Sequence, residues 1–158
     1  EKMYELIGFY KHGFKVSLPS KLEKMMLSNP DGGDRNYGMK LNNGKWLIPL
    51  IRSNQNVFNN SKPVFYDYIQ FDVFYLNKQG MVEVNSDLSS TVSNEDNMEF
   101  FQKIKDNTQY IIHPDEIVAD NFMLAVLAEN SNAYGNFSTG GQKLLKEVIN
   151  LVKVHNKN

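Results

Sequence analysis

The chain has 158 residues, a formal net charge of −1 and no cysteine. A charge this small, without a long charged run, argues against nucleic acid or an anionic membrane as the main partner. The lack of cysteine excludes a disulfide scaffold, a thiolate zinc site and a cysteine nucleophile. No apolar run is long enough to span a bilayer, and the length suits a single domain over residues 1–158.

The N-terminal part, to about residue 33, is predicted to hold two short helices and a turn. Residues 1–9 indicate the tail of a helix that Gly8 closes, because glycine readily adopts the left-handed conformation found at helix ends. A short helix is expected from about Ser20. The run Asn-Pro-Asp-Gly-Gly at residues 29–33 predicts a turn.

The central part is predicted to begin with a β-hairpin. Residues 37–41 and 45–51 flank Asn42-Asn43-Gly44, a strong signal for a tight turn between two strands. Pro49 has no N–H to donate, so its strand is expected at an edge of the sheet or at a bulge.

A second pair of strands is expected further along. Residues 64–76 are rich in aromatic and β-branched side chains and predict one long strand. A turn at residues 78–80 should pair it with residues 81–84. Its aromatic stripe is interpreted as core rather than as a ligand platform.

The C-terminal part is predicted to be helical. One helix is expected over residues 94–105, a second from Pro114 to about Glu129, and a third after a polar loop at residues 130–139. The fold class is therefore α+β, with an antiparallel hairpin-rich sheet inserted among helices.

Two carboxylates on the second of these helices are the strongest candidates for chemistry. Glu116 and Asp120 are one turn apart and hence on the same face. That face continues with Met123 and Leu127, so it is expected to point toward the protein interior. A carboxylate in such a place needs hydrogen-bond donors, a cation or a metal.

The segment also resembles a known family. Glu116-Ile-Val-Ala-Asp120 has the Glu-x-x-x-Asp form of the second active-site helix of the gluzincin zinc metallopeptidases. Residues 4–9 (YELIGF), 28–32 (SNPDG) and 110–122 (YIIHPDEIVADNF) are similar to segments that follow a zinc-binding helix in bacterial proteins. The resemblance implies that Glu116 is a zinc ligand and that Asp120 orients a histidine ligand from another helix.

The chain departs from that family in one respect. The family's two histidine ligands and its general base belong to a His-Glu-x-x-His motif, and no such motif occurs in these residues. Only His12, His113 and His155 are present, and no two of them are four residues apart. The resemblance then implies that the chain is the C-terminal portion of a larger metallopeptidase-like protein, inactive alone. Its partners would be the missing N-terminal segment and a peptide or protein substrate.

Each candidate residue also has a structural interpretation. Glu116 stands where a capping-box glutamate would reach back to the helix start. Asp120 could be a surface residue or a buried hydrogen-bond acceptor. His113 is expected to cap the helix or pack on Pro114 rather than bind metal, and a zinc site built from His12, His113 and Glu116 has no support from spacing.

A second hypothesis is a non-catalytic domain. It would keep the protease-like helix only as a scaffold and bind a partner through a sheet edge or the asparagine-rich loops. Whether the chain belongs to an enzyme therefore depends on residues outside these 158.

Overall fold

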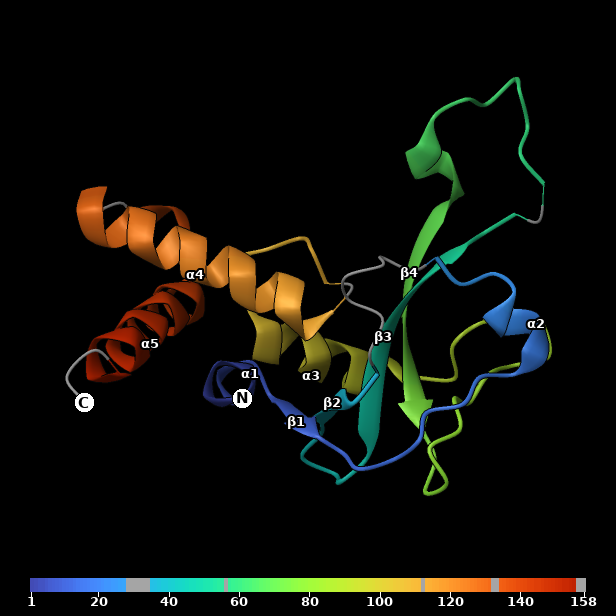
Figure 1. Ribbon diagram of the computed structural model, residues 1–158, viewed down its shortest axis with the longest axis horizontal. Helices are drawn as coiled ribbons and strands as arrows, with labels where there is room; N and C mark the ends of the chain where they lie inside the picture. Colours follow the sequence, from blue (N-terminus) through green and yellow to red (C-terminus); the bar gives the residue numbers. More distant parts are fainter. Residues whose placement is uncertain (28–34, 56, 112, 132–133, 156–158) are drawn as a thin grey trace.

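The computed structural model describes residues 1–27, 35–55, 57–111, 113–131 and 134–155 (Figure 1). In chain order the elements are α1 (Lys2–Leu6), β1 (Phe9–Lys11), α2 (Ser20–Glu23), β2 (Tyr37–Lys40), β3 (Trp46–Ser53), the 3₁₀ helix η1 (Phe65–Tyr68), β4 (Ile69–Leu76), α3 (Asn94–Ile104), α4 (Pro114–Ser131), the 3₁₀ helix η2 (Tyr134–Asn136) and α5 (Thr139–His155). A four-stranded antiparallel sheet with helices before and after it confirms the α+β class.

The sheet has the strand order β1-β2-β3-β4, and each neighbouring pair is antiparallel. The predicted hairpin between β2 and β3 is confirmed. Its turn is closed by the Leu41 N–H, which donates to the Lys45 carbonyl at 2.9 Å, and Gly44 takes up a φ of +83° that other residues rarely adopt. The longest pairing joins β3 to β4.

Side chains alternate between the two faces of the sheet, and each face has its own core. In Figure 1, α4 and α5 lie on one side of β3 and β4, and α2 lies on the other. The larger core lies under the C-terminal helices and includes Leu47, Val73, Tyr75, Phe100, Ile104, Ile117, Leu144 and Leu145. The smaller core lies under α2 and consists of Leu22, Ile48, Leu50, Phe74, Leu76 and Val82.

The prediction of one strand over residues 64–76 is right only in its second half, because β4 begins at Ile69 and η1 precedes it. The cause is Tyr68, whose side chain is buried and whose hydroxyl bonds to the backbone. It accepts from the Asn59 N–H and donates to the Lys62 carbonyl, both at 2.8 Å. Bonds of this kind fix a loop, which an alternating pattern cannot signal.

The aromatic stripe of this stretch is likewise core only in part. Val73 and Tyr75 are buried, whereas Phe71 is 43% exposed and Phe65 is 62% exposed. In Figure 1, β3 and β4 extend past the helices that pack on the larger core, and the exposed part of the stripe lies toward that end.

Pro49 does not mark an edge strand, since β3 lies between β2 and β4. The strand tolerates the proline because β2 pairs with β3 only at Trp46 and Leu47. At Pro49 itself the only ladder partner is Val73 of β4, so the strand is locally an edge there.

The turn at residues 78–80 forms as predicted, with the Gly80 N–H donating to the Asn77 carbonyl at 3.0 Å. The residues that follow it meet β4 through an isolated bridge, Leu76↔Val82, rather than as a full strand. The turn predicted at residues 29–33 falls outside the described residues.

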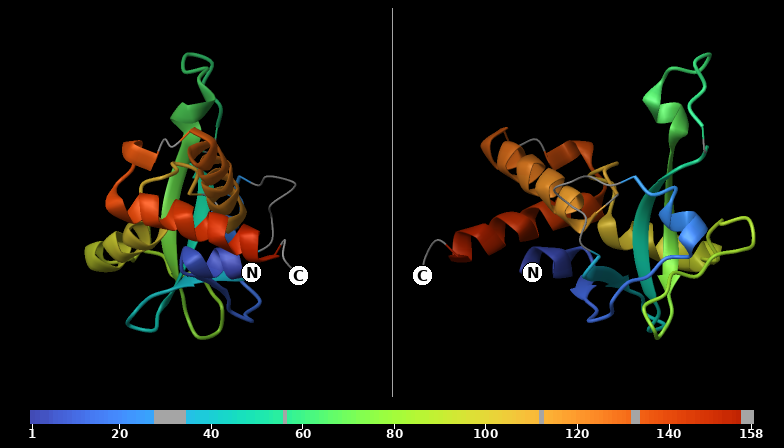
Figure 2. Two further views of the ribbon diagram at one scale, coloured as in Figure 1. Left: turned by 90° about the vertical axis from the view of Figure 1, so that its left-hand side faces the viewer. Right: turned by 45° about the vertical axis from the view of Figure 1, so that its right-hand side comes forward.

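The helices of the C-terminal part occur where the sequence predicts them. Ser93 caps α3 by accepting from the Asp96 N–H at 3.2 Å, and α4 begins at Pro114. Figure 2 shows α1 alongside α5. Among the described residues, no helix is both long enough and apolar enough to cross a membrane.

Candidate functional site

The candidate site lies at the start of α4, and His113 shapes that start. Pro114 occupies the first helical position, where its missing N–H costs nothing. The His113 Nδ1 accepts from the Asp115 N–H at 3.2 Å, which satisfies one of the amides that a helix leaves open at its N-terminus. The predicted capping role of His113 is therefore confirmed.

Glu116 and Asp120 lie one turn apart along one flank of α4, and both are half-buried. The Thr108 hydroxyl donates to Oδ2 of Asp120, which orients that carboxylate. Glu116 forms no hydrogen bond or ion pair with the part of the chain that the structure describes, so the capping-box bond expected as its alternative is not formed there.

The loop that carries Thr108 is held between α4 and α5. The Asn107 side chain donates to Oδ1 of Asn121 on α4 at 2.7 Å and to the Gly141 carbonyl on α5 at 3.1 Å. Asn107 and Asn121 are both buried. The position of Thr108, and with it the orientation of Asp120, is thus fixed by two helices at once.

The expected direction of the carboxylate face is wrong. Met123 and Leu127, which continue it, are 52% and 56% exposed. Because α4 turns 100° per residue, its inward face is a different one, formed by Ile117, Asn121, Ala125 and Ala128. Glu116 and Asp120 lie at the border between the two faces.

The outward face of α4 is unusually apolar. We call it the outer face; it carries Ala119, Phe122, Met123, Val126 and Leu127, all of them exposed. A helix on a protein surface normally shows polar side chains there. The two carboxylates therefore adjoin an apolar surface that is open to solvent in this chain.

The described residues do not assemble a metal site by themselves. No group of three histidine, aspartate or glutamate side chains within them could hold an ion. The site considered from His12, His113 and Glu116 is accordingly not formed. His12 Nδ1 instead accepts from the Phe14 N–H at 3.0 Å, its ring stacks on Phe14, and burial lowers its pKa. The side chain of His155 is outside the described residues.

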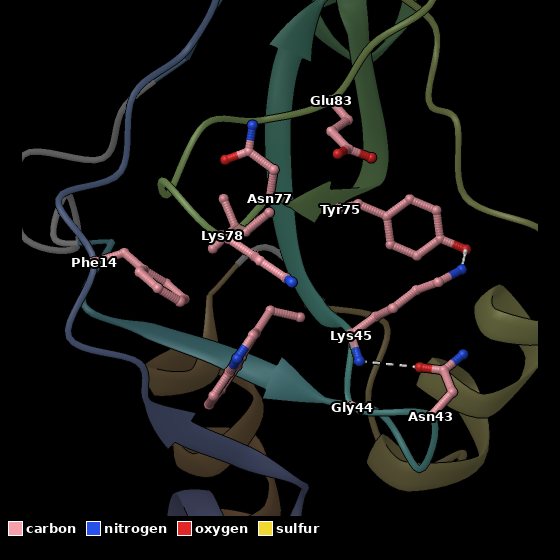
Figure 3. A pocket seen from close by; sticks show the side chains of 10 residues that line it. Phe14, Asn43, Gly44, Lys45, Tyr75, Asn77, Lys78 and Glu83 are labelled. Carbon is pink, nitrogen blue, oxygen red and sulfur yellow. Dashed lines mark hydrogen bonds between the residues drawn. The ribbon is translucent and has the colours of Figure 1, made fainter.

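A pocket of about 580 Å³ lies elsewhere, where the β2–β3 turn meets the end of β4 (Figure 3). Its lining includes Phe14, Lys45, Trp46, Lys78 and Glu83. The volume is in the range of small-molecule sites, but the pocket is open and its exposed Lys78 and Glu83 are ordinary surface charges.

Lys45 and Tyr75, which line one side of this pocket, form hydrogen bonds to Asp96 that hold the fold together. Asp96 accepts from the Tyr75 hydroxyl at 2.5 Å and from Lys45 at 3.2 Å. The Tyr75 hydrogen bond, followed by those from Lys45 and Asn43, lowers the pKa of Asp96, and bonds to Tyr75 and Asp96 raise that of Lys45. Lys45 thus keeps its proton and anchors the first turn of α3 to the sheet.

Sequence reasoning found Glu116, Asp120 and His113 because a short motif carries all three. It missed Thr108 and Asn107, which act on α4 from a loop with no pattern of its own. The pocket residues come from four separate segments, so no local signal could have grouped them. Comparison with protein-family models, with curated proteins and with solved structures gave no match.

Proposed function

We propose that this chain is part of a zinc-dependent metallopeptidase, in which Glu116 is a zinc ligand and Asp120 orients a histidine ligand. The histidines would come from a His-Glu-x-x-His segment outside these 158 residues. The observation that carries the proposal is the Glu116 carboxylate, unpaired among the described residues, one turn from an Asp120 that Thr108 orients.

The geometry of the two carboxylates suits these roles. A carboxylate that binds a metal must be ionised, and at least one of its oxygens must be available to the metal. Neither carboxylate oxygen of Glu116 accepts a hydrogen bond from another described residue. Asp120 has one oxygen bonded to Thr108, which leaves the other for an imidazole N–H. Carboxylate–histidine pairs of this kind fix the ring and its tautomer at zinc sites.

The outer face of α4 supports the proposal independently. A helix that carries the zinc-binding histidines would have to pack beside Glu116, and the surface next to Glu116 is apolar and uncovered. Side chains such as Phe122 and Met123 lose contact with water when another element packs on them, which is favourable by about 25 cal/mol per Å² of apolar surface.

In this proposal Glu116 would hold the zinc and Asp120 would orient a histidine ligand, and the segment outside these residues would provide the general base. Bound zinc supplies a polarised carbonyl and an acidified water for peptide hydrolysis. By itself the chain has one ligand of at least three, so we expect it to show no zinc-dependent peptidase activity.

The first test is the reading frame ahead of Glu1, with the mass of the natural protein measured intact. A His-Glu-x-x-His segment on a predicted helix supports the proposal. A natural protein without such a segment overturns it.

The second test measures zinc in the full natural protein and in three variants. We expect Glu116→Gln to lose zinc, and Asp120→Asn to bind it about 10- to 100-fold more weakly because the histidine is less well oriented. Glu129→Gln is the matched control, since Glu129 is on the same helix but bonds to Lys153. Equal zinc content in Glu116→Gln and Glu129→Gln would rule out the ligand role.

The alternative is a non-catalytic binding or scaffold domain, and one observation favours it. The described residues expose an apolar face on α4 that a partner protein would cover. Under this alternative the natural protein contains no zinc, and α4 serves only to dock a partner.

A further inference from the structure

The loop between β3 and β4 projects away from the rest of the molecule (Figures 1 and 2). It comprises residues 54, 55 and 57–68, and η1 is its last part. Large apolar side chains cover it. They are Val57, Phe58, Val64, Phe65 and Tyr66, with exposed fractions of 76%, 60%, 53%, 62% and 76%, and we call them the apolar tip.

The loop is held together by its own hydrogen bonds. Asn54 donates from its backbone to the Tyr68 carbonyl and from its side chain to the Asp67 carbonyl, both at 2.9 Å. The Tyr68 hydroxyl bonds to the backbone at Asn59 and Lys62, and the Phe58 ring stacks on Tyr68 at 5.5 Å. The apolar tip is therefore displayed by an ordered scaffold rather than by a frayed segment.

Charge distinguishes the possible occupants of this surface. Between residues 54 and 68 the only charged residues are Lys62 and Asp67, which are opposite in sign. A binding mode driven by attraction to anionic lipid or to a charged protein would need a net charge here. Only the transfer of apolar and aromatic surface out of water remains as a driving force.

Shape and polarity favour a bilayer. The apolar tip is carried by a loop that projects from the rest of the molecule (Figures 1 and 2), so it can reach a deformable surface, whereas a protein partner would need a groove that accepts the whole loop. Phenylalanine and tyrosine are well placed at the boundary between lipid headgroups and acyl chains. Backbone groups that enter this region need partners within the protein, and in the apolar tip the Val64 and Tyr66 carbonyls accept from the Asp67 and Ile69 N–H groups.

We propose that the apolar tip is a membrane-interface anchor, which inserts Phe65, Tyr66 and their neighbours at the surface of an uncharged bilayer. The inference does not rest on the proposed peptidase function.

The test is flotation of the protein with phosphatidylcholine vesicles. Phe65→Ser/Tyr66→Ser should lower the vesicle-bound fraction at least tenfold, and binding of the wild type should be the same in low and high salt. Both side chains are largely exposed, so their replacement should leave the melting temperature unchanged. The control is Phe122→Ser/Met123→Ser, which removes two exposed apolar side chains from α4 and should not change vesicle binding.

A second measurement does not depend on how the serine variant folds. A Tyr66→Trp variant should be quenched by vesicles of brominated phosphatidylcholine, and a Phe122→Trp variant should not. The proposal is overturned if the wild type does not bind these vesicles, if binding requires anionic lipid, or if both serine variants lose binding equally. It is also overturned if Phe65→Ser/Tyr66→Ser changes only the self-association of the protein, measured by sedimentation. That result would assign the apolar tip to contact with a second copy of the chain.

Discussion

The two long helices differ in which face carries their large apolar side chains. On α5 most of these residues are buried, with Leu144, Leu145, Val148 and Ile149 in the core and charged residues such as Lys143 and Lys153 outside; the exception is Val154 near the end of the helix, which is 61% exposed. On α4 most of them are exposed, although Val118 and Leu124 pack partly against the core. Its buried face has Ala125, Ala128 and Asn121 beside a single large residue, Ile117, while Phe122, Met123 and Val126 are outside.

The difference teaches what each helix requires. The large apolar side chains of α5 form mainly one stripe, and packing that stripe against the core is enough to bury most of them. The small residues on the inward side of α4 let it pack closely against the rest of the domain, but they leave its larger apolar side chains in water. The apolar side chains of α5 are therefore mostly accounted for by the core, whereas those on the outer face of α4 are not.

The largest expected effect tests the burial contrast directly. Leu145→Ala on α5 should lower the free energy of unfolding by about 2–5 kcal/mol, because it leaves a cavity in the core. Met123→Ala on α4 should cost less than about 1 kcal/mol, since that side chain is half in water. Denaturant unfolding of both variants measures this. Equal losses would mean that the outer face of α4 is covered in this chain.

The next effect concerns how α5 is docked. A Cβ on Gly141 would lie 2.2 Å from the Asn107 Oδ1 and 2.5 Å from an Asp106 oxygen, so Gly141→Ala should cost roughly 1–3 kcal/mol. In the neighbouring Gly140→Ala, the Cβ would lie 3.3 Å from the flexible Lys105 side chain and 3.8 Å from the Ser138 Oγ, so stability should change by less than about 0.5 kcal/mol. Both variants replace a helical glycine by alanine, so they share the change in helix propensity. The difference between their melting temperatures therefore measures the steric clash at Gly141. A harmless Gly141→Ala would contradict the close packing of loop and helix.

A smaller effect depends on pH. The Ser138 side chain and N–H donate to Asp106 at 2.6 and 2.9 Å, which lowers the pKa of that carboxyl group. A lowered folded-state pKa stabilises the fold at pH values above the unfolded pKa of about 3.9, and this stabilisation is lost as the pH falls through the folded pKa.

Asp106→Ala should therefore destabilise by about 1 kcal/mol or less at pH 7, since the site is exposed, and the difference from wild type should shrink in acid. Urea unfolding at several pH values measures it. A difference that grows as the pH falls would contradict the assigned sign.

The smallest expected effect is that of Glu116→Gln in this chain. Because Glu116 bonds to no described residue, the change should alter stability by less than about 0.5 kcal/mol. A loss of 1 kcal/mol or more in thermal unfolding would assign Glu116 to a helix cap. That result would weaken the proposed ligand role without any metal being measured.

Local patterns predicted most elements correctly. The Asn42–Gly44 hairpin, the start of α4 at Pro114 and the helix at residues 94–105 each have a signal within a few residues. The failures have a common cause. η1 arises because the buried Tyr68 bonds to Asn59 and Lys62, six and more residues away, and no pattern in residues 64–76 carries that information.

The candidate site divides in the same way. The sequence by itself determined that Glu116 and Asp120 lie on one side of a helix, because helical geometry fixes residues four apart. Which way that side points was decided by the tertiary structure: the small residues of α4 pack inward, and the loop at Asn107 and Thr108 holds α4 against α5. The direction in which a helix side points, and how far it is exposed, depend on which other elements pack against the helix. Those elements come from residues distant in the chain, so a local pattern does not contain this information.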